Sequence, residues 1–96
     1  MIKCSRLTLG KLTFQTVETP LGKKNFILIK GKKGYIMCGY LNLKVAQKFG
    51  DTAVKVVGVT HVKDVLSAKV HSVTPAARKL GINKNQPLKD VLRIIA

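Results

Sequence analysis

Cys38 is the side chain of this sequence best suited to covalent chemistry. It ends an apolar run, precedes Gly39, and lies shortly before Asn42, a residue type that often begins a helix. The positive end of a helix dipole favours the thiolate, which is the nucleophilic form of cysteine. A nucleophilic thiol also needs a base beside it, and the spacing identifies none, so no catalytic residue is assigned. Cysteine also packs in cores as a small apolar residue, and packing is the stronger interpretation.

Met37, Cys38 and Gly39 together form a hypothetical ligand-binding site at the end of a predicted strand. Glycine carries no side chain, so a ligand or a second backbone can approach it closely. We therefore expect a protein that binds a ligand or a partner at this point. An enzyme that depends on Cys38 is a further alternative and ranks last.

The remaining polar residues do not suggest a metal centre or an acid–base pair. His61 and His71 are too far apart to form a helical ligand pair, and a zinc site needs three or four convergent ligands. The four carboxylates are dispersed along the chain, at Glu18, Asp51, Asp64 and Asp90. We predict that Asp64 and Asp90 lie in helices and pair there with lysines one turn away. No metal or cofactor is expected.

The charge of the chain suggests a second kind of partner. The sequence has 18 Lys and Arg against 4 Asp and Glu, a net charge of +14. Clustered lysines bind nucleic-acid phosphates without regard to base sequence. We expect one such cluster at one end of the sheet, from two neighbouring turns that hold Lys23, Lys24, Lys30, Lys32 and Lys33. Non-specific nucleic-acid binding is therefore an alternative function, although no nucleic-acid-binding motif is present and a solvated lysine turn explains residues 31–34 more simply.

Strands are predicted to dominate the first 40 residues. Apolar and β-branched residues fill positions 2–8, 12–17, 25–30 and 35–38, and each gap holds glycine or proline. This spacing indicates an antiparallel meander. The runs 26–29 and 35–38 do not alternate between apolar and polar residues, so we expect both faces of these strands to be covered. In so short a chain, helices would cover one face and another subunit the other, which makes residues 1–40 a predicted oligomerisation region.

Helix signals dominate the rest of the chain, residues 41–96. Asn42 begins a predicted helix 43–49 that packs Val45 and Phe49 inward, and Thr60 begins another over 61–66. Thr74 and Pro75 start a third that Gly81 ends, and a fourth follows Pro87. Between the first two helices, residues 53–59 form a predicted strand. The class is α+β: an antiparallel meander followed by a helix-rich half in a single domain, because 96 residues are too few for two.

One segment carries a family resemblance. The run from Gly34 through Tyr35, Met37 and Cys38 to Gly39 resembles a signature of the YunC-like family, small bacterial and archaeal proteins classed as a domain of unknown function. The resemblance continues through residues 57–60, 65–70 and 76–82, so it covers nearly the whole chain. It implies an α+β fold whose N-terminal β region forms a tetramer, and it implies no activity.

Composition excludes several other classes of protein. The length and the 46% hydrophobic content exclude a large multi-step enzyme and a collagenous or low-complexity chain. The first residues lack the apolar run of a signal peptide, and no apolar run is long enough to span a membrane. Two cysteines, outside any CxxC pair, exclude a disulfide framework. We therefore expect a homo-oligomeric, cytoplasmic binding protein.

Overall fold

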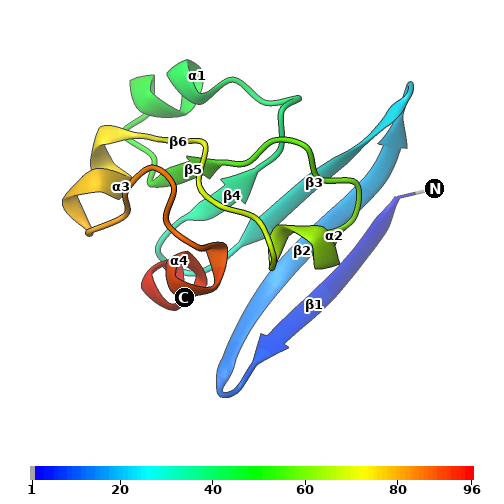
Figure 1. The fold of residues 1–96 in the computed structure, drawn as a ribbon, viewed down its shortest axis with the longest axis horizontal. Coiled ribbons are helices and arrows are strands. Elements are labelled where there is room, and N and C mark those ends of the chain that lie inside the picture. The colour runs from blue at the N-terminus through cyan, green and yellow to red at the C-terminus, as the bar shows by residue number, and fades with distance from the viewer. Residues whose placement is uncertain (1) are drawn as a thin grey trace.

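The computed structural model describes residues 2–96, which form one six-stranded sheet in the order β1-β2-β3-β4-β5-β6 (Figure 1). Its first four strands form the predicted antiparallel meander: β1 (Lys3–Leu9), β2 (Leu12–Leu21), β3 (Lys24–Lys30) and β4 (Tyr35–Met37). Gly10 and Gly22 have positive φ angles, 61° and 56°, at the turns after β1 and β2. Two-residue hairpin turns need such angles, which glycine adopts without strain. β2 is longer than predicted and continues to Leu21.

The remaining elements are short: α1 (Leu43–Lys48), β5 (Ala53–Lys55), α2 (Val62–Val65), β6 (Ser72–Val73), α3 (Pro75–Lys79) and α4 (Leu88–Ile95). The α+β class is confirmed. The predicted strand over 53–59 ends at Lys55, and Gly58 takes a positive φ of 73° that is incompatible with continued extension. Helices of four to eight residues alternate with two strands and with loops, so the structure does not clearly support a helix-rich second half.

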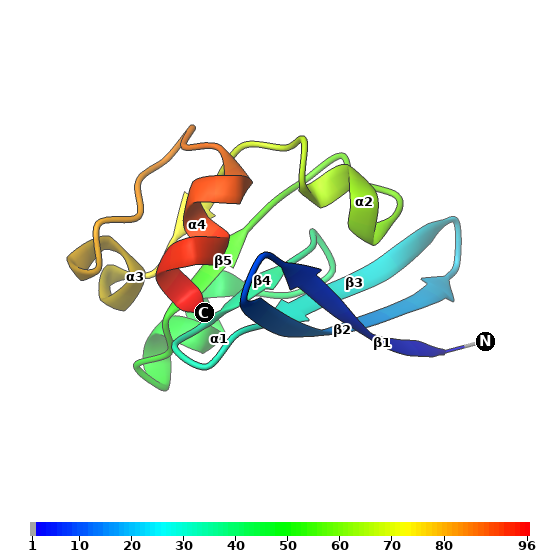
Figure 2. The same cartoon turned by 90° about the horizontal axis from the view of Figure 1, so that it is seen from below.

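The main core lies between one face of the sheet and helix α4. Leu88, Val91, Leu92 and Ile95 of α4 are fully buried, at the spacing predicted for one helix face. They belong to the same apolar cluster as buried residues of β2, β3, β4 and β5, namely Phe14, Ile27, Ile29, Ile36 and Val54. Each buried side chain of this size contributes about 1.5–3 kcal/mol. Figure 2 shows α2 and α4 on this face of the sheet.

Helix α1 lies on the opposite face. Its Ala46 forms a second, small apolar cluster with Met37 of β4 and Ala53 of β5. Strand β4 is therefore covered on both faces, as predicted, but its second cover is α1 of the same chain and not another subunit. On β3 only one face is fully buried: Ile27 and Ile29 are buried, whereas Phe26 and Leu28 remain partly exposed.

Two details of the helices differ from the sequence prediction. Val45 and Phe49 do not pack inward: they are 48% and 76% exposed, because the six-residue α1 places Ala46 and the partly buried Leu43 against the sheet instead. The residue that begins α2 is His61 rather than Thr60. The starts at Asn42 and Thr74 are confirmed, and their side chains accept hydrogen bonds from the backbone N–H groups of Lys44 and Ala77. No helix within residues 2–96 is long and apolar enough to cross a membrane.

Candidate functional site

A cavity of about 390 Å³ lies where the chain leaves β4 and β5. These two strands are parallel neighbours, so their carboxyl ends lie at the same edge of the sheet. In open sheets, the crevice outside the carboxyl ends of parallel strands is the usual place for a ligand. The volume is in the range of small-molecule sites. Three segments line the cavity: the turn between β2 and β3, the β4 extension (residues 38–40) and the β5 extension (residues 57–60). The lining residues are Lys23, Lys24, Asn25, Cys38, Gly39, Tyr40, Val57, Gly58, Val59 and Thr60.

Cys38 lies at the inner wall of this cavity. Its side chain is 4% exposed and belongs to the main core. The backbone N–H of Ile27 donates to Cys38 Sγ at 3.4 Å, and the N–H of Cys38 donates to the Ile27 carbonyl at 3.3 Å. The thiol is thus a packed side chain that also faces the cavity.

The predicted trio of Met37, Cys38 and Gly39 is divided by the alternation of the strand. Cys38 and Gly39 line the cavity, whereas Met37 is buried beneath α1 on the other face of the sheet. Gly39 presents bare backbone, since a Cβ built on it meets no atom within 4 Å. Met37 therefore supports the fold rather than the site.

Tyr40 fastens the β4 extension to the β2–β3 hairpin. Its hydroxyl donates to the carbonyl of Leu21, with the carbonyl of Lys24 3.3 Å away. About half of the side chain, 47%, remains exposed. The ring thus forms a partly exposed aromatic wall of the cavity whose position is fixed at the hydroxyl end.

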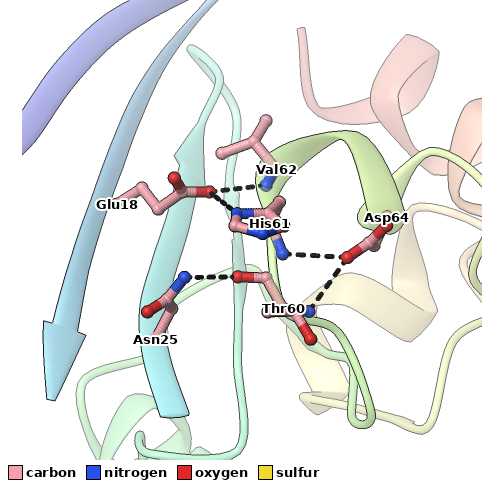
Figure 3. Close-up of polar contacts among 6 residues, drawn as sticks. All are labelled: Glu18, Asn25, Thr60, His61, Val62 and Asp64. Carbon is pink, nitrogen blue, oxygen red and sulfur yellow. Dashed lines mark hydrogen bonds and ion pairs between the residues drawn. The ribbon is translucent and has the colours of Figure 1, made fainter.

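Polar contacts hold the other wall, the segment from β5 to α2, against the same hairpin (Figure 3). Glu18 Oε1 of β2 accepts from the N–H of Val62 at 2.9 Å and lies 3.6 Å from His61 Nδ1. Asn25 Nδ2 of β3 donates to the carbonyl of Thr60 at 2.8 Å. These contacts join residues 35 and 44 positions apart in sequence. Sequence reasoning missed them because no local pattern signals so distant a pair.

Asp64 folds the start of α2 into a closed turn. Its Oδ2 accepts from the N–H groups of His61 and Thr60 at 2.9 and 3.1 Å. These two backbone hydrogen bonds, His61 first, hold the pKa of Asp64 below its ordinary value. The predicted pairing with lysines is therefore wrong: within residues 2–96 neither Asp64 nor Asp90 forms an ion pair with a lysine. Capping the helix is the role of Asp64.

The predicted lysine cluster does not form at one end of the sheet. Lys23 and Lys24 line the cavity, but Lys30, Lys32 and Lys33 lie at the other end of β3, beside the last residues of α4. Consecutive turns of a meander lie at opposite ends of the shared strand, and seven residues of strand span about 20 Å. The structure thus separates the cluster into two turns with different surroundings.

Histidine and cysteine side chains are also dispersed. In the described part of the chain no three His, Cys, Asp or Glu side chains converge to hold a metal ion. His61 faces Glu18, while His71 Nδ1 lies 3.2 Å from the hydroxyl of Ser72. Cys38, His61 and His71 therefore do not meet.

Comparison with known proteins finds relatives that match nearly the whole length of this chain. Residues 37–95 match the family described as "Domain of unknown function (DUF1805)". The chain is 33% identical over 97 residues to the uncharacterized protein YunC of Bacillus subtilis (strain 168), covering 96% of this chain and 95% of that protein. It is also similar to the crystal structure of a protein of unknown function from Thermoplasma acidophilum, with 40% identity and a TM-score of 0.95, over 100% of this chain and 94% of that one.

Proposed function

This chain belongs to the DUF1805, or YunC-like, family, and from that premise we propose that it binds a small ligand in the cavity beyond β4 and β5. The observation that carries the proposal is the convergence of three segments on one hollow at the carboxyl ends of the parallel strands. Contacts of Cys38, Tyr40 and Asn25 fix the segments after β4 and β5 to the β2–β3 hairpin. A cavity that is already formed binds a ligand with little ordering cost.

The test is to block the cavity without disturbing the fold. Gly39→Val adds bulk where open space lies beside the backbone, and Thr13→Val is the matched control on an exposed site of β2 far from the cavity. We expect compounds from a fragment library to shift the amide signals of Tyr40 and Gly58 in the parent protein and in Thr13→Val, and not in Gly39→Val. Failure of every compound at millimolar concentration, or equal binding by Gly39→Val, contradicts the proposal.

Nucleic-acid binding is the competing proposal, and the net charge of +14 supports it. The separation of Lys23 and Lys24 from Lys32 and Lys33 argues against a single phosphate-binding face. A titration with labelled oligonucleotides tests it. Binding that persists at about 0.15 M salt, with a salt slope of several phosphate contacts, favours nucleic acid; binding that vanishes on addition of salt contradicts it.

A Cys38-dependent reaction is the third proposal. It is supported by the position of the thiol at the cavity wall, and weakened by the burial of that thiol and its hydrogen bond from Ile27.

We further propose that the chain assembles with copies of itself through residues 1–40, since Leu28 of this region remains partly exposed on the face opposite α4.

A further inference from the structure

The charged side chains that line the cavity are all positive. Lys23 and Lys24 are exposed at its rim, and none of its ten lining residues is acidic. The acidic side chains of the adjoining elements are already engaged, because Glu18 accepts from Val62 and Asp64 caps α2. Two ammonium groups without a carboxylate between them favour an anion.

Backbone donors add to this positive lining. Along the two strand extensions, the N–H groups of Cys38, Val56 and Thr60 donate within the chain, to Ile27, Met37 and Asp64. Between them lie N–H groups that donate to no acceptor in residues 2–96, those of Gly39, Tyr40, Val57, Gly58 and Val59. Backbone N–H groups are strong donors that bind an oxyanion well when a ligand replaces water. Gly39 and Gly58 carry no side chain that would keep a ligand from them.

Much of the remaining lining is apolar. Cys38, Val57, Val59 and the ring of Tyr40 line the cavity together with the polar Asn25 and Thr60. A fully hydrated inorganic anion gains nothing from such a surface, whereas an organic group attached to the anion buries apolar area there.

We propose that the ligand is a small organic anion, a phosphate or a carboxylate attached to an apolar group, with its charge between Lys23, Lys24 and the backbone of Gly39 and Gly58. This inference rests on the proposed function of the cavity. The oxyanion is the chemistry shared by both classes, and the apolar group lies against Tyr40 and Cys38.

The test compares aromatic probes of similar size and different charge, and an inorganic anion, on the full chain. Phenyl phosphate, benzoate, inorganic phosphate and the neutral benzyl alcohol are each titrated while the amide signals of Gly39, Tyr40, Gly58 and Val59 are followed by NMR. We expect phenyl phosphate or benzoate to bind at least about tenfold more tightly than benzyl alcohol and than inorganic phosphate, the size of one charge-assisted contact. The better of the two anions identifies the class.

A pair of double variants separates a site from general charge. Lys23→Ala with Lys24→Ala should weaken binding of the better anion by about tenfold or more. Lys32→Ala with Lys33→Ala removes the same charge at the other end of β3 and should change it by less than about twofold. Both pairs are exposed, so circular dichroism and thermal unfolding should match the parent.

The outcomes distinguish the two proposals. If benzyl alcohol and the anions bind the cavity equally well, the anion inference is overturned while the ligand cavity stands. If the two double variants lose affinity equally, the attraction is general and the inference is also overturned. If no probe moves the cavity amides, both the inference and the proposed function fail.

Discussion

Two glycines of this chain, Gly31 and Gly39, differ in the space available for a side chain. A Cβ at Gly31 would lie 2.2 Å from the backbone oxygen of Ile95, and backbone cannot move aside as a side chain can. A Cβ at Gly39 would meet nothing within 4 Å. We predict that Gly31→Ala lowers the free energy of unfolding by about 1–3 kcal/mol or more, and that Gly39→Ala changes it by less than about 1 kcal/mol. Urea unfolding of both variants measures this; equal losses would contradict the close approach of β3 to α4.

The two cysteines should differ in reactivity because they differ in exposure. Cys4 is exposed on β1, whereas Cys38 is buried and its sulfur accepts from Ile27. We predict that a thiol reagent labels Cys4 of the native protein rapidly and Cys38 at least about a hundredfold more slowly, at the rate at which the site opens. Cys4→Ser leaves Cys38 as the single thiol for this measurement. Labelling of Cys38 as fast as in the unfolded chain would favour the enzyme alternative instead.

Tyr35 carries the largest change in proton affinity. Burial, followed by the hydrogen bond to the Asp51 carboxylate and the charge of that group, raises its pKa from 10.0 to about 12. The fold therefore favours the neutral phenol, and this stabilisation is present below pH 10 and lost as the pH rises toward 12. Ultraviolet titration should show one tyrosine that ionises late and is absent in Tyr35→Phe. Asp51→Asn should bring that ionisation to lower pH; an unchanged curve would contradict the contact.

Helix α2 depends on a distant strand for its position. It has only four residues, too few to be stable alone, and Glu18 of β2 accepts its first N–H, that of Val62. We predict that Glu18→Ala costs about 1–3 kcal/mol, because the Val62 N–H loses its acceptor. Amide exchange at Val62 and Val65 should quicken accordingly. Glu18→Gln retains an acceptor oxygen and serves as the control, so similar losses in both variants would assign the effect to the contact between Glu18 and His61.

The sequence predicted correctly those turns and helices that depend on residues close to one another in the chain. The hairpin turns, the starts at Asn42 and Thr74, and the apolar face of α4 follow from the preferences of single residues and short spacings. The cavity could not be predicted, because it depends on parallel pairing of β4 with β5 across α1. Cys38 and Gly39 were named from the sequence as part of a candidate site, and they are two of the ten residues that line the cavity. The prediction of a single lysine cluster was wrong, because the two turns are close in sequence but lie at opposite ends of β3.

At the scale of the molecule, the two faces of the sheet are unequally covered. Helices α2 and α4 cover one face, and α1 covers the other only around Met37 and Ala53 (Figure 2). Val17 and Leu28 lie in the same cross-strand row as Met37, beyond α1, and are only partly buried. If a second chain covers the exposed part of this apolar row, the burial of its apolar surface stabilises the assembly.

We predict that this row lies in the contact between copies of the chain. Native mass spectrometry at micromolar concentration should give a multiple of 10.5 kDa, with a tetramer as the expected species. Leu28→Lys places a charge in the row and should shift the mass to the monomer without changing the circular dichroism, since the side chain is not in the core. Val45→Lys makes the same kind of change on exposed α1 and should leave the assembly intact. A parent protein that is monomeric contradicts the assembly itself, whereas dissociation by Val45→Lys alone would move the contact from residues 1–40 to α1.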